Sequence, residues 1–200
     1  MTMTQLPSQR APGAAPQILC LAGFMGSGKT TVGTLLARQL AWRFVDLDDR
    51  IEESAGLKIP EIFERFGEPA FRQIEADQLR AALGRAAEVG DGTVLALGGG
   101  TYAQLGCPEF LKNARVPVLW LDSPLEVLLA RCMTMSGRPL FRDEMSFQML
   151  YEQRIPSYQQ ADFRVDGAGE PSQVVAEILR RGIVASGGNE SHLVVEKPQP

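Results

Sequence analysis

The hydrophobic residues of this chain fall into short, unbroken apolar runs that are separated by segments of helical spacing. Residues 18–22 (ILCLA), 93–97 (TVLAL) and 118–122 (VLWLD) show no alternation of polar and apolar positions. Such runs are typical of strands that are covered on both faces, as in a parallel sheet. Between the runs, apolar residues recur three and four positions apart, which is the spacing of one helix face. The pattern predicts an α/β protein.

We expect five strands, over residues 18–22, 44–48, 93–97, 118–122 and 162–166. We expect helices behind residue 30 and over residues 49–56, 59–66, 68–88, 124–133, 146–158 and 171–182. Asp49 and Glu52 match a capping box that would open the helix that Gly56 ends. These elements predict a three-layer α/β/α domain with a central, parallel, five-stranded sheet. The carboxyl ends of its strands would share one edge, where ligands bind.

The length of the chain, 200 residues, suits one buried core, and we place the domain at residues 17–183. We expect residues 1–16 and 184–200 to be a disordered lead and tail. No apolar run approaches the roughly 20 residues that span a bilayer, and the lead has no signal-peptide core. The three widely spaced cysteines form neither a disulfide framework nor a zinc pattern, which favours the cytoplasm.

Charge and histidine content narrow the classes of function further. A net charge of −4 argues against a broad nucleic-acid-binding face. The one histidine, His192, lies in the expected tail, which argues against histidine acid–base chemistry.

The most informative segment is residues 23–30 (GFMGSGKT), which fits the pattern G-x-x-x-x-G-K-[ST] without a mismatch. Its glycines would turn backbone N–H groups toward phosphate oxygens, its lysine would neutralise the β- and γ-phosphates, and its threonine would hold Mg²⁺. A chance glycine-rich turn is the alternative reading, but the strand before it and the helix after it favour a site for a nucleoside triphosphate. The candidate phosphate-binding residues are Gly26, Ser27, Gly28, Lys29, Thr30 and Thr31.

The second predicted strand ends in two carboxylates, Asp46 and Asp48. On an extended segment, residues two apart point the same way. A phosphoryl-transferring enzyme needs one carboxylate near Mg²⁺ and another to accept the proton of the attacking hydroxyl. The alternative is that both are helix caps, but Asp49 already satisfies the capping pattern. We therefore favour a catalytic role for both.

Glycines and arginines near other strand ends complete the candidates. Gly98, Gly99 and Gly100 follow a buried strand and would form either a tight turn or a floor on which a ligand rests. Arg138 lies in the irregular segment at about 134–145, which we interpret as a lid that brings an arginine to the phosphoryl group on closure. By spacing alone, Arg72 would pair with Glu75 on its own helix, and Arg154 would equally suit a helix surface.

With these residues in view, the chain resembles the shikimate kinase family, small P-loop kinases of the nucleoside-monophosphate-kinase type. The resemblance covers residues 17–183, in order and at the spacing of the family. It runs through the loop at 23–30, D-x-D at 46–48, F-R-x-x-E at 71–75, the glycine triplet, R-P-L at 138–140 and R-x-P-x-Y at 154–158. This combination is far more specific than the loop alone. A departure is T-Y-A-Q at 101–104, where small apolar residues are usual.

The resemblance implies ATP-dependent phosphorylation of the 3-hydroxyl of shikimate, a step toward chorismate and the aromatic amino acids, by a cytoplasmic monomer. Asp48 would hold the shikimate hydroxyls and act as base, while Lys29, Thr30 and, through water, Asp46 would serve the phosphates and Mg²⁺. The remaining implied contacts are Arg72 and Arg154 on the carboxylate, Gly98–Gly100 beneath the substrate, Arg138 in the lid and Arg131 stacked near adenine. The implied partners are therefore ATP and shikimate, with neither nucleic acid nor membrane.

Two other functions remain open at this point. One is a related kinase for another small polyol acid, such as gluconate, which would share the loop and sheet but not F-R-x-x-E joined to G-G-G and R-P-L. The other is a noncatalytic nucleotide-binding relative. Such a protein would be expected to have lost Lys29, Asp48 or Arg138, and all three are present.

Overall fold

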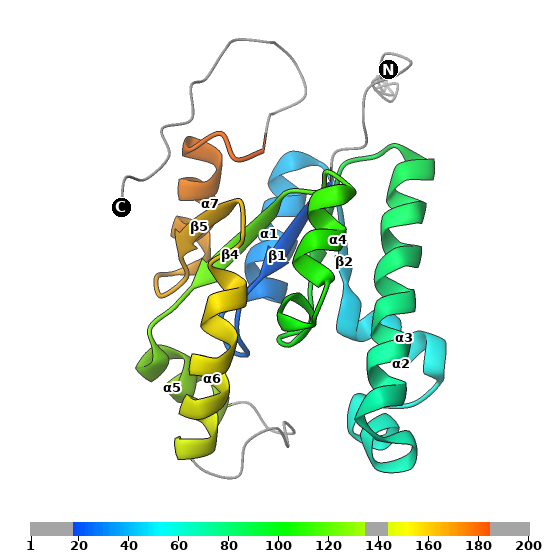
Figure 1. The fold of residues 1–200 in the computed structure, drawn as a ribbon. Helices are drawn as coiled ribbons and strands as arrows, with labels where there is room; N and C mark the ends of the chain where they lie inside the picture. The colour runs from blue at the N-terminus through cyan, green and yellow to red at the C-terminus, as the bar shows by residue number, and fades with distance from the viewer. Residues whose placement is uncertain (1–17, 135–143, 185–200) are drawn as a thin grey trace, which may run out of the picture.

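The computed structural model describes residues 18–134 and 144–184. Five strands form one sheet in the order β2-β3-β1-β4-β5 (Figure 1). They are β1 (Ile18–Ala22), β2 (Arg43–Asp46), β3 (Thr93–Ala96), β4 (Val118–Asp122) and β5 (Phe163–Asp166). Every pairing is parallel, which confirms the predicted fold class.

Helices cover both faces of the sheet, and each face has its own hydrophobic core (Figure 1). Leu19 and Leu21 of β1 face α1 (Lys29–Leu40) and α7 (Pro171–Arg180). Cys20 and Ala22 face the opposite way. The helices that contribute to this second core are α2 (Leu47–Ala55), α3 (Ile59–Val89), α4 (Cys107–Asn113), α5 (Leu125–Met133) and α6 (Glu144–Tyr158). Because helices cover both faces of the sheet, polar functional side chains can reach a ligand only at the ends of the strands.

The predicted capping box is wrong, because the helix begins two residues earlier than expected. Strand β2 ends at Asp46 and α2 starts at Leu47, so Asp46 is the N-cap, and its Oδ1 accepts the N–H of Asp48 at 3.0 Å. Glu52 turns instead to the next helix, where it accepts from Lys58 Nζ at 2.6 Å and from the Ile59 N–H at 3.1 Å. Asp48 therefore lies in a helical turn and not on an extended strand.

The predicted break between two helices at residue 67 is confirmed. Within α3, Gly67 has φ 75° and ψ 173°, outside the helical region. The sequence reading missed η1 (Thr101–Ala103) and α4. These elements have only three and seven residues, too few to show a helical period.

Several expectations fall wholly or partly outside the described residues. The lead that we expected to be disordered lies there, as do residues 135–143 of the predicted lid and nearly all of the expected tail. Val184, at the start of the predicted tail, is buried in the core formed by α1 and α7. Cys20, Cys107 and Cys132 are buried, and none of them forms a disulfide within the described residues. Within residues 18–134 and 144–184, no helix combines the length and apolar character that crossing a membrane requires.

The close approach of α1 to the sheet yields a test of the packing. A Cβ atom added at Gly33 would lie 2.5 Å from Phe44 Cε2 and 3.0 Å from Leu21 Cδ1. We expect Gly33→Ala to lower the free energy of unfolding by about 1–3 kcal/mol, because the helix must move off the sheet. Urea denaturation would measure the change.

The matched control is Gly84→Ala in α3, where an added Cβ meets nothing within 4 Å. There the lower chain entropy of alanine should raise the stability by about 0.5–1 kcal/mol. Equal effects of the two substitutions would contradict the proposed packing role of Gly33.

Candidate active site

The loop between β1 and α1 is folded as a cradle for an anion. Gly23 and Gly26 have φ angles of 149° and 80°, which residues with a side chain rarely adopt. A Cβ on Gly26 would also lie 2.9 Å from Cys132 Sγ and 3.1 Å from the Leu128 carbonyl oxygen. Helix α1 begins at Lys29 with no side-chain cap and no acidic residue in its first turn. The helix dipole therefore favours an anion at this end of α1.

Lys29 lies across this loop and is largely buried. Its Nζ donates to the carbonyl oxygens of Gly23 at 2.8 Å and Phe24 at 3.1 Å. These two contacts hold the ammonium group beside the loop, where it can reach a phosphate oxygen. The binding of phosphate by Lys29 stays a prediction.

Asp46 joins the loop to the first turn of α2. Its Oδ2 accepts from Thr30 Oγ1 at 2.7 Å, while its Oδ1 caps the N–H of Asp48. The sequence analysis assigned the cap to Asp49 and not to Asp46, and this prediction is wrong. The carboxylate of Asp46 both caps α2 and contacts the loop. A hydroxyl and a carboxylate side by side are hard oxygen donors of the kind that Mg²⁺ takes. No cluster of three or more His, Cys, Asp or Glu that could hold a metal occurs in the described part of the chain. Because Mg²⁺ usually adds substrate phosphates and several waters to one or two protein ligands, Thr30 and Asp46 fit a cation that is also held by phosphate and water.

The glycine triplet follows β3 and turns its carbonyl groups toward the protein. The Gly98 carbonyl accepts the N–H of Thr101 at 3.1 Å, and the Gly100 carbonyl accepts the N–H of Ala103 at 3.2 Å. Gln104 Nε2 also donates to the Gly100 carbonyl, at 3.2 Å. Asp48 lies against this turn, since a Cβ on Gly98 would be 2.6 Å from Asp48 Oδ1. The triplet is therefore a tight turn that also forms a floor next to Asp48.

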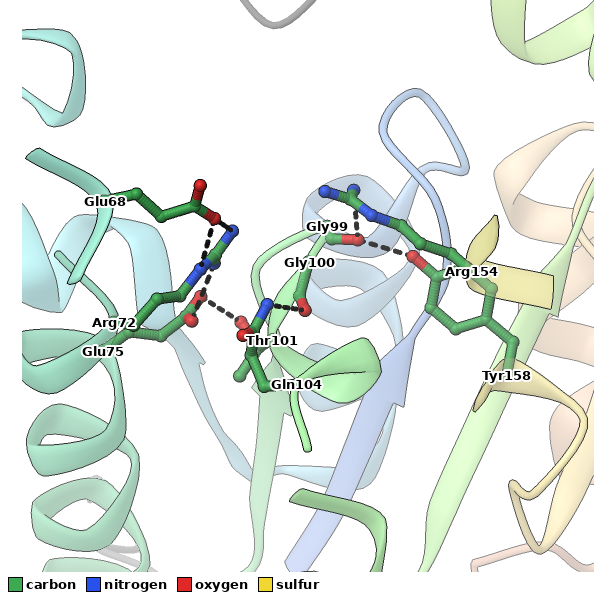
Figure 2. A network of polar contacts seen from close by, with 9 residues as sticks. All are labelled: Glu68, Arg72, Glu75, Gly99, Gly100, Thr101, Gln104, Arg154 and Tyr158. Carbon is green, nitrogen blue, oxygen red and sulfur yellow. Dashed lines mark hydrogen bonds and ion pairs between the residues drawn. The ribbon is translucent and has the colours of Figure 1, made fainter. Parts of the chain in front are cut away.

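Arg72 and Arg154 come from different helices, and both approach Gly100 (Figure 2). A Cβ added there would lie 3.1 Å from Arg154 Nη2 and 3.4 Å from Arg72 Nη1. Arg72 pairs with Glu75 Oε2 at 2.9 Å and with Glu68 Oε1 at 3.0 Å. The pairing with Glu75 that spacing alone suggested is thus present, and it does not prevent Arg72 from facing Arg154.

Arg154 is placed differently, without an acidic partner. In the described residues, no carboxylate lies within ion-pair distance of its guanidinium, which donates to the Gly99 carbonyl at 2.9 Å and lies 5.4 Å from the centre of the Phe24 ring. Burial lowers the pKa of Arg154, and the positive charge of Arg72 acts in the same direction. A half-buried cation near a second cation favours an added anion, because the anion offsets both the lost hydration and the repulsion between the like charges.

A cavity of about 450 Å³ connects the loop with the carboxylates. Its lining includes Asp46, Asp48, Gly99 and Arg131, together with loop residues 26–32 and residues 167–171 before α7. Arg131 donates to the carbonyl oxygens of Gly26 at 3.3 Å, Gly167 at 3.0 Å and Ala168 at 2.8 Å. It therefore ties together two loops that form one wall.

The structure gathers most of the sequence-predicted residues in one region. The six candidate phosphate-binding residues, Asp46, Asp48, Gly99 and Arg131 line the cavity, whereas Arg72, Arg154, Gly98 and Gly100 adjoin it at the triplet. Arg138 lies outside the described residues. The stacking of Arg131 on adenine and the contacts of each residue with substrate stay predictions.

The sequence reading gave no role to the side chains that support these groups, although Tyr158 is part of the R-x-P-x-Y motif. Thr101 Oγ1 donates to Glu75 Oε1 at 2.7 Å, and the hydroxyl of Tyr158 donates to the Gly99 carbonyl at 2.5 Å (Figure 2). Thr101 and Gln104 both lie in the T-Y-A-Q segment that departs from the family pattern. That departure was the one available signal for them.

Comparison with known proteins gives a consistent family. A family model described as shikimate kinase matches residues 25–182. A shikimate kinase from Persephonella marina is 42% identical over 163 residues, which are 80% of this chain and 96% of that protein. A solved structure of shikimate kinase from Acinetobacter baumannii in complex with shikimate has a TM-score of 0.74 and 36% identity. The match covers 82% of this chain and 91% of that one.

A gluconokinase structure from Sinorhizobium meliloti is also similar, with a TM-score of 0.55 over 82% of this chain and 90% of that one. Its 19% identity shows a shared fold alone.

The wall formed by Arg131 can be tested through nucleotide affinity. We expect Arg131→Ala to raise the KM for the nucleoside triphosphate on the order of tenfold, since three carbonyl groups on two loops lose their common donor. Steady-state kinetics with the nucleotide varied would measure it. The control is Arg80→Ala, which removes an exposed arginine paired with Asp77 and should leave the KM for the nucleoside triphosphate unchanged. An unchanged nucleotide KM in Arg131→Ala would show that the tie is dispensable.

Proposed function

The chain belongs to the shikimate kinase family, and we propose that it transfers the γ-phosphoryl group of ATP to the 3-hydroxyl of shikimate, giving shikimate 3-phosphate and ADP. The observation that carries the choice of acceptor is the approach of two arginines to Gly100: Arg72, and the half-buried Arg154, which has no acidic partner among the described residues. Two guanidinium groups that flank one position suit a carboxylate, because both can donate hydrogen bonds to its oxygens. Shikimate carries such a carboxylate on a ring with three hydroxyl groups.

The donor side of the reaction uses the loop at residues 23–30. Its N–H groups and Lys29 bind the β- and γ-phosphates of ATP, and Thr30 with Asp46 would hold Mg²⁺, Asp46 through water. When bound, the cation neutralises charge that develops on the phosphates. Arg131 forms part of the nucleotide side of the cavity. We assign Arg138 to a lid over residues 134–145 that contacts the transferring group on closure.

The acceptor side places a base next to the attacking hydroxyl. Asp48 lies against Gly98 and lines the same cavity as Lys29. The 3-hydroxyl oxygen attacks the γ-phosphorus, the bond from that phosphorus to the β-phosphate bridging oxygen breaks, and the hydroxyl proton passes to Asp48. Arg72 and Arg154 fix the ring through its carboxylate while this happens. We further propose that the enzyme is a monomer and acts in the cytoplasm.

The wild-type reaction is the first test. With shikimate and MgATP, a coupled assay of ADP release should show turnover, and kcat/KM for gluconate should be at least about 100-fold lower because gluconate is not shaped for this pair of arginines. Comparable turnover of both acceptors would favour a broader polyol-acid kinase. Tight ATP binding by folded protein without transfer to either acceptor would favour a nucleotide-binding relative.

Asp48→Asn tests the assignment of the base. We expect kcat to fall by about 10²- to 10⁴-fold, because the amide cannot accept the proton. ATP affinity, measured by calorimetry, should stay within about twofold of the wild-type value, since the loop and Lys29 are untouched. Retained turnover in this variant would remove Asp48 from the role of base.

A further inference from the structure

The hydroxyl of Tyr158 and the guanidinium of Arg154 share one acceptor, the carbonyl oxygen of Gly99 (Figure 2). The two residues are four apart near the end of α6, so their side chains leave the same face of the helix. A carbonyl oxygen has two lone pairs, and these two donors account for both. Gly99 is thus anchored to α6 at two points.

The side chain of Tyr158 is held much more firmly than that of Arg154. Its ring is buried to 1% exposure and stacks on Trp120 of β4, with centroids 6.0 Å apart and an interplanar angle of 23°. The central sheet therefore sets the position of the hydroxyl. Arginine has a long chain with many rotamers, and a fixed acceptor reduces its choices.

The anchored carbonyl belongs to the same peptide unit as the N–H of Gly100. In a trans peptide the C=O and N–H point in opposite directions, so fixing one fixes the other. Glycine adopts positive and negative φ with similar ease, and a Gly-Gly peptide can therefore rotate at little cost unless it is held. Within the described residues, no acceptor is recorded for the Gly100 N–H, which leaves it available to a ligand.

We infer that Tyr158 is a positioning residue for the acceptor: its hydroxyl locks the Gly99–Gly100 peptide and, through the shared carbonyl, the guanidinium of Arg154. The inference deepens the proposed function and rests on it for the identity of the ligand. Tyr158 is not among the residues that line the cavity at the phosphate loop. Its effect should therefore fall on the acceptor and not on the nucleotide.

The protonation state of Tyr158 agrees with a donor role. Burial raises the pKa of Tyr158 to about 12. The hydroxyl consequently keeps its proton at any pH at which the enzyme would be assayed, and it donates throughout.

The test is Tyr158→Phe, which keeps the ring and its stacking on Trp120 and removes the hydroxyl alone. We expect KM for shikimate to rise about tenfold, the KM for MgATP to stay within twofold, and the melting temperature to change by less than about 3 °C. The control is Tyr151→Phe on the same helix. For Tyr151 no hydrogen bond is recorded within the described residues, and this substitution should leave both KM values unchanged.

Three results would overturn the inference. An unchanged KM for shikimate would show that the hydroxyl of Tyr158 does not contribute to binding of the acceptor. An equal rise in both KM values, or a variant that does not fold, would assign Tyr158 to the general stability of the domain.

A crystal structure of ligand-free Tyr158→Phe separates this inference from the proposed function. A rotated Gly99–Gly100 peptide, or an Arg154 side chain that has left the Gly99 carbonyl, would support positioning by Tyr158 even if the wild-type protein turned over no shikimate. The same peptide and the same Arg154 contact as in the wild type would overturn it. Absent turnover by the wild type would count against the proposed function alone.

Discussion

The order of the parallel strands is the constraint on which the rest of this site depends. Strand β1 lies between β3 and β4, so the loop after β1 must emerge beside the turn after β3. The Leu97 N–H donates to the Leu21 carbonyl at 3.0 Å, which extends the pairing of these strands toward their carboxyl ends. Gly99 then packs against Met25, inside the phosphate loop. Donor and acceptor are brought together by strand pairing, before any catalytic side chain is considered.

Charge at this edge is arranged by unequal pairing. Arg72 has two carboxylate partners, one of them the buried Glu75, which is also bound by Thr101. Arg154 instead has carbonyl and aromatic contacts within the described chain. The charge of Arg72 is thus stabilised before a ligand binds, whereas the charge of Arg154 would still be stabilised further by a bound anion. This asymmetry explains how two like charges can lie so close together in the folded protein.

The sequence predicted the sheet and most of the site because both depend on local signals. Apolar runs located the strands, and the glycine–lysine loop identified its own ligand class. What failed was the assignment of polar partners. Asp49 and Glu52 matched a capping box by spacing, yet Asp46 caps the helix because β2 ends one residue before α2 begins. The link from Tyr158 to Gly99 spans 59 residues of sequence, and only the folded chain brings such groups together. Arg72 illustrates the difference between local and distant contacts. Its pairing with Glu75 on the same helix was predictable from spacing, whereas its approach to Arg154 could be expected only from the family resemblance.

The two oxygens of Asp46 have separate tasks, one on Thr30 and one on the backbone of Asp48. A single side chain therefore sets the spacing between the candidate metal ligand and the candidate base, and its length matters as much as its charge. Glutamate at this position would add a methylene and displace one contact or the other, and asparagine would offer a single oxygen where two are used. For protein engineering, residue 46 is consequently a poor place to retune the preference for one divalent cation over another. Residue 30 is the better choice, because changing it leaves the cap on α2 intact.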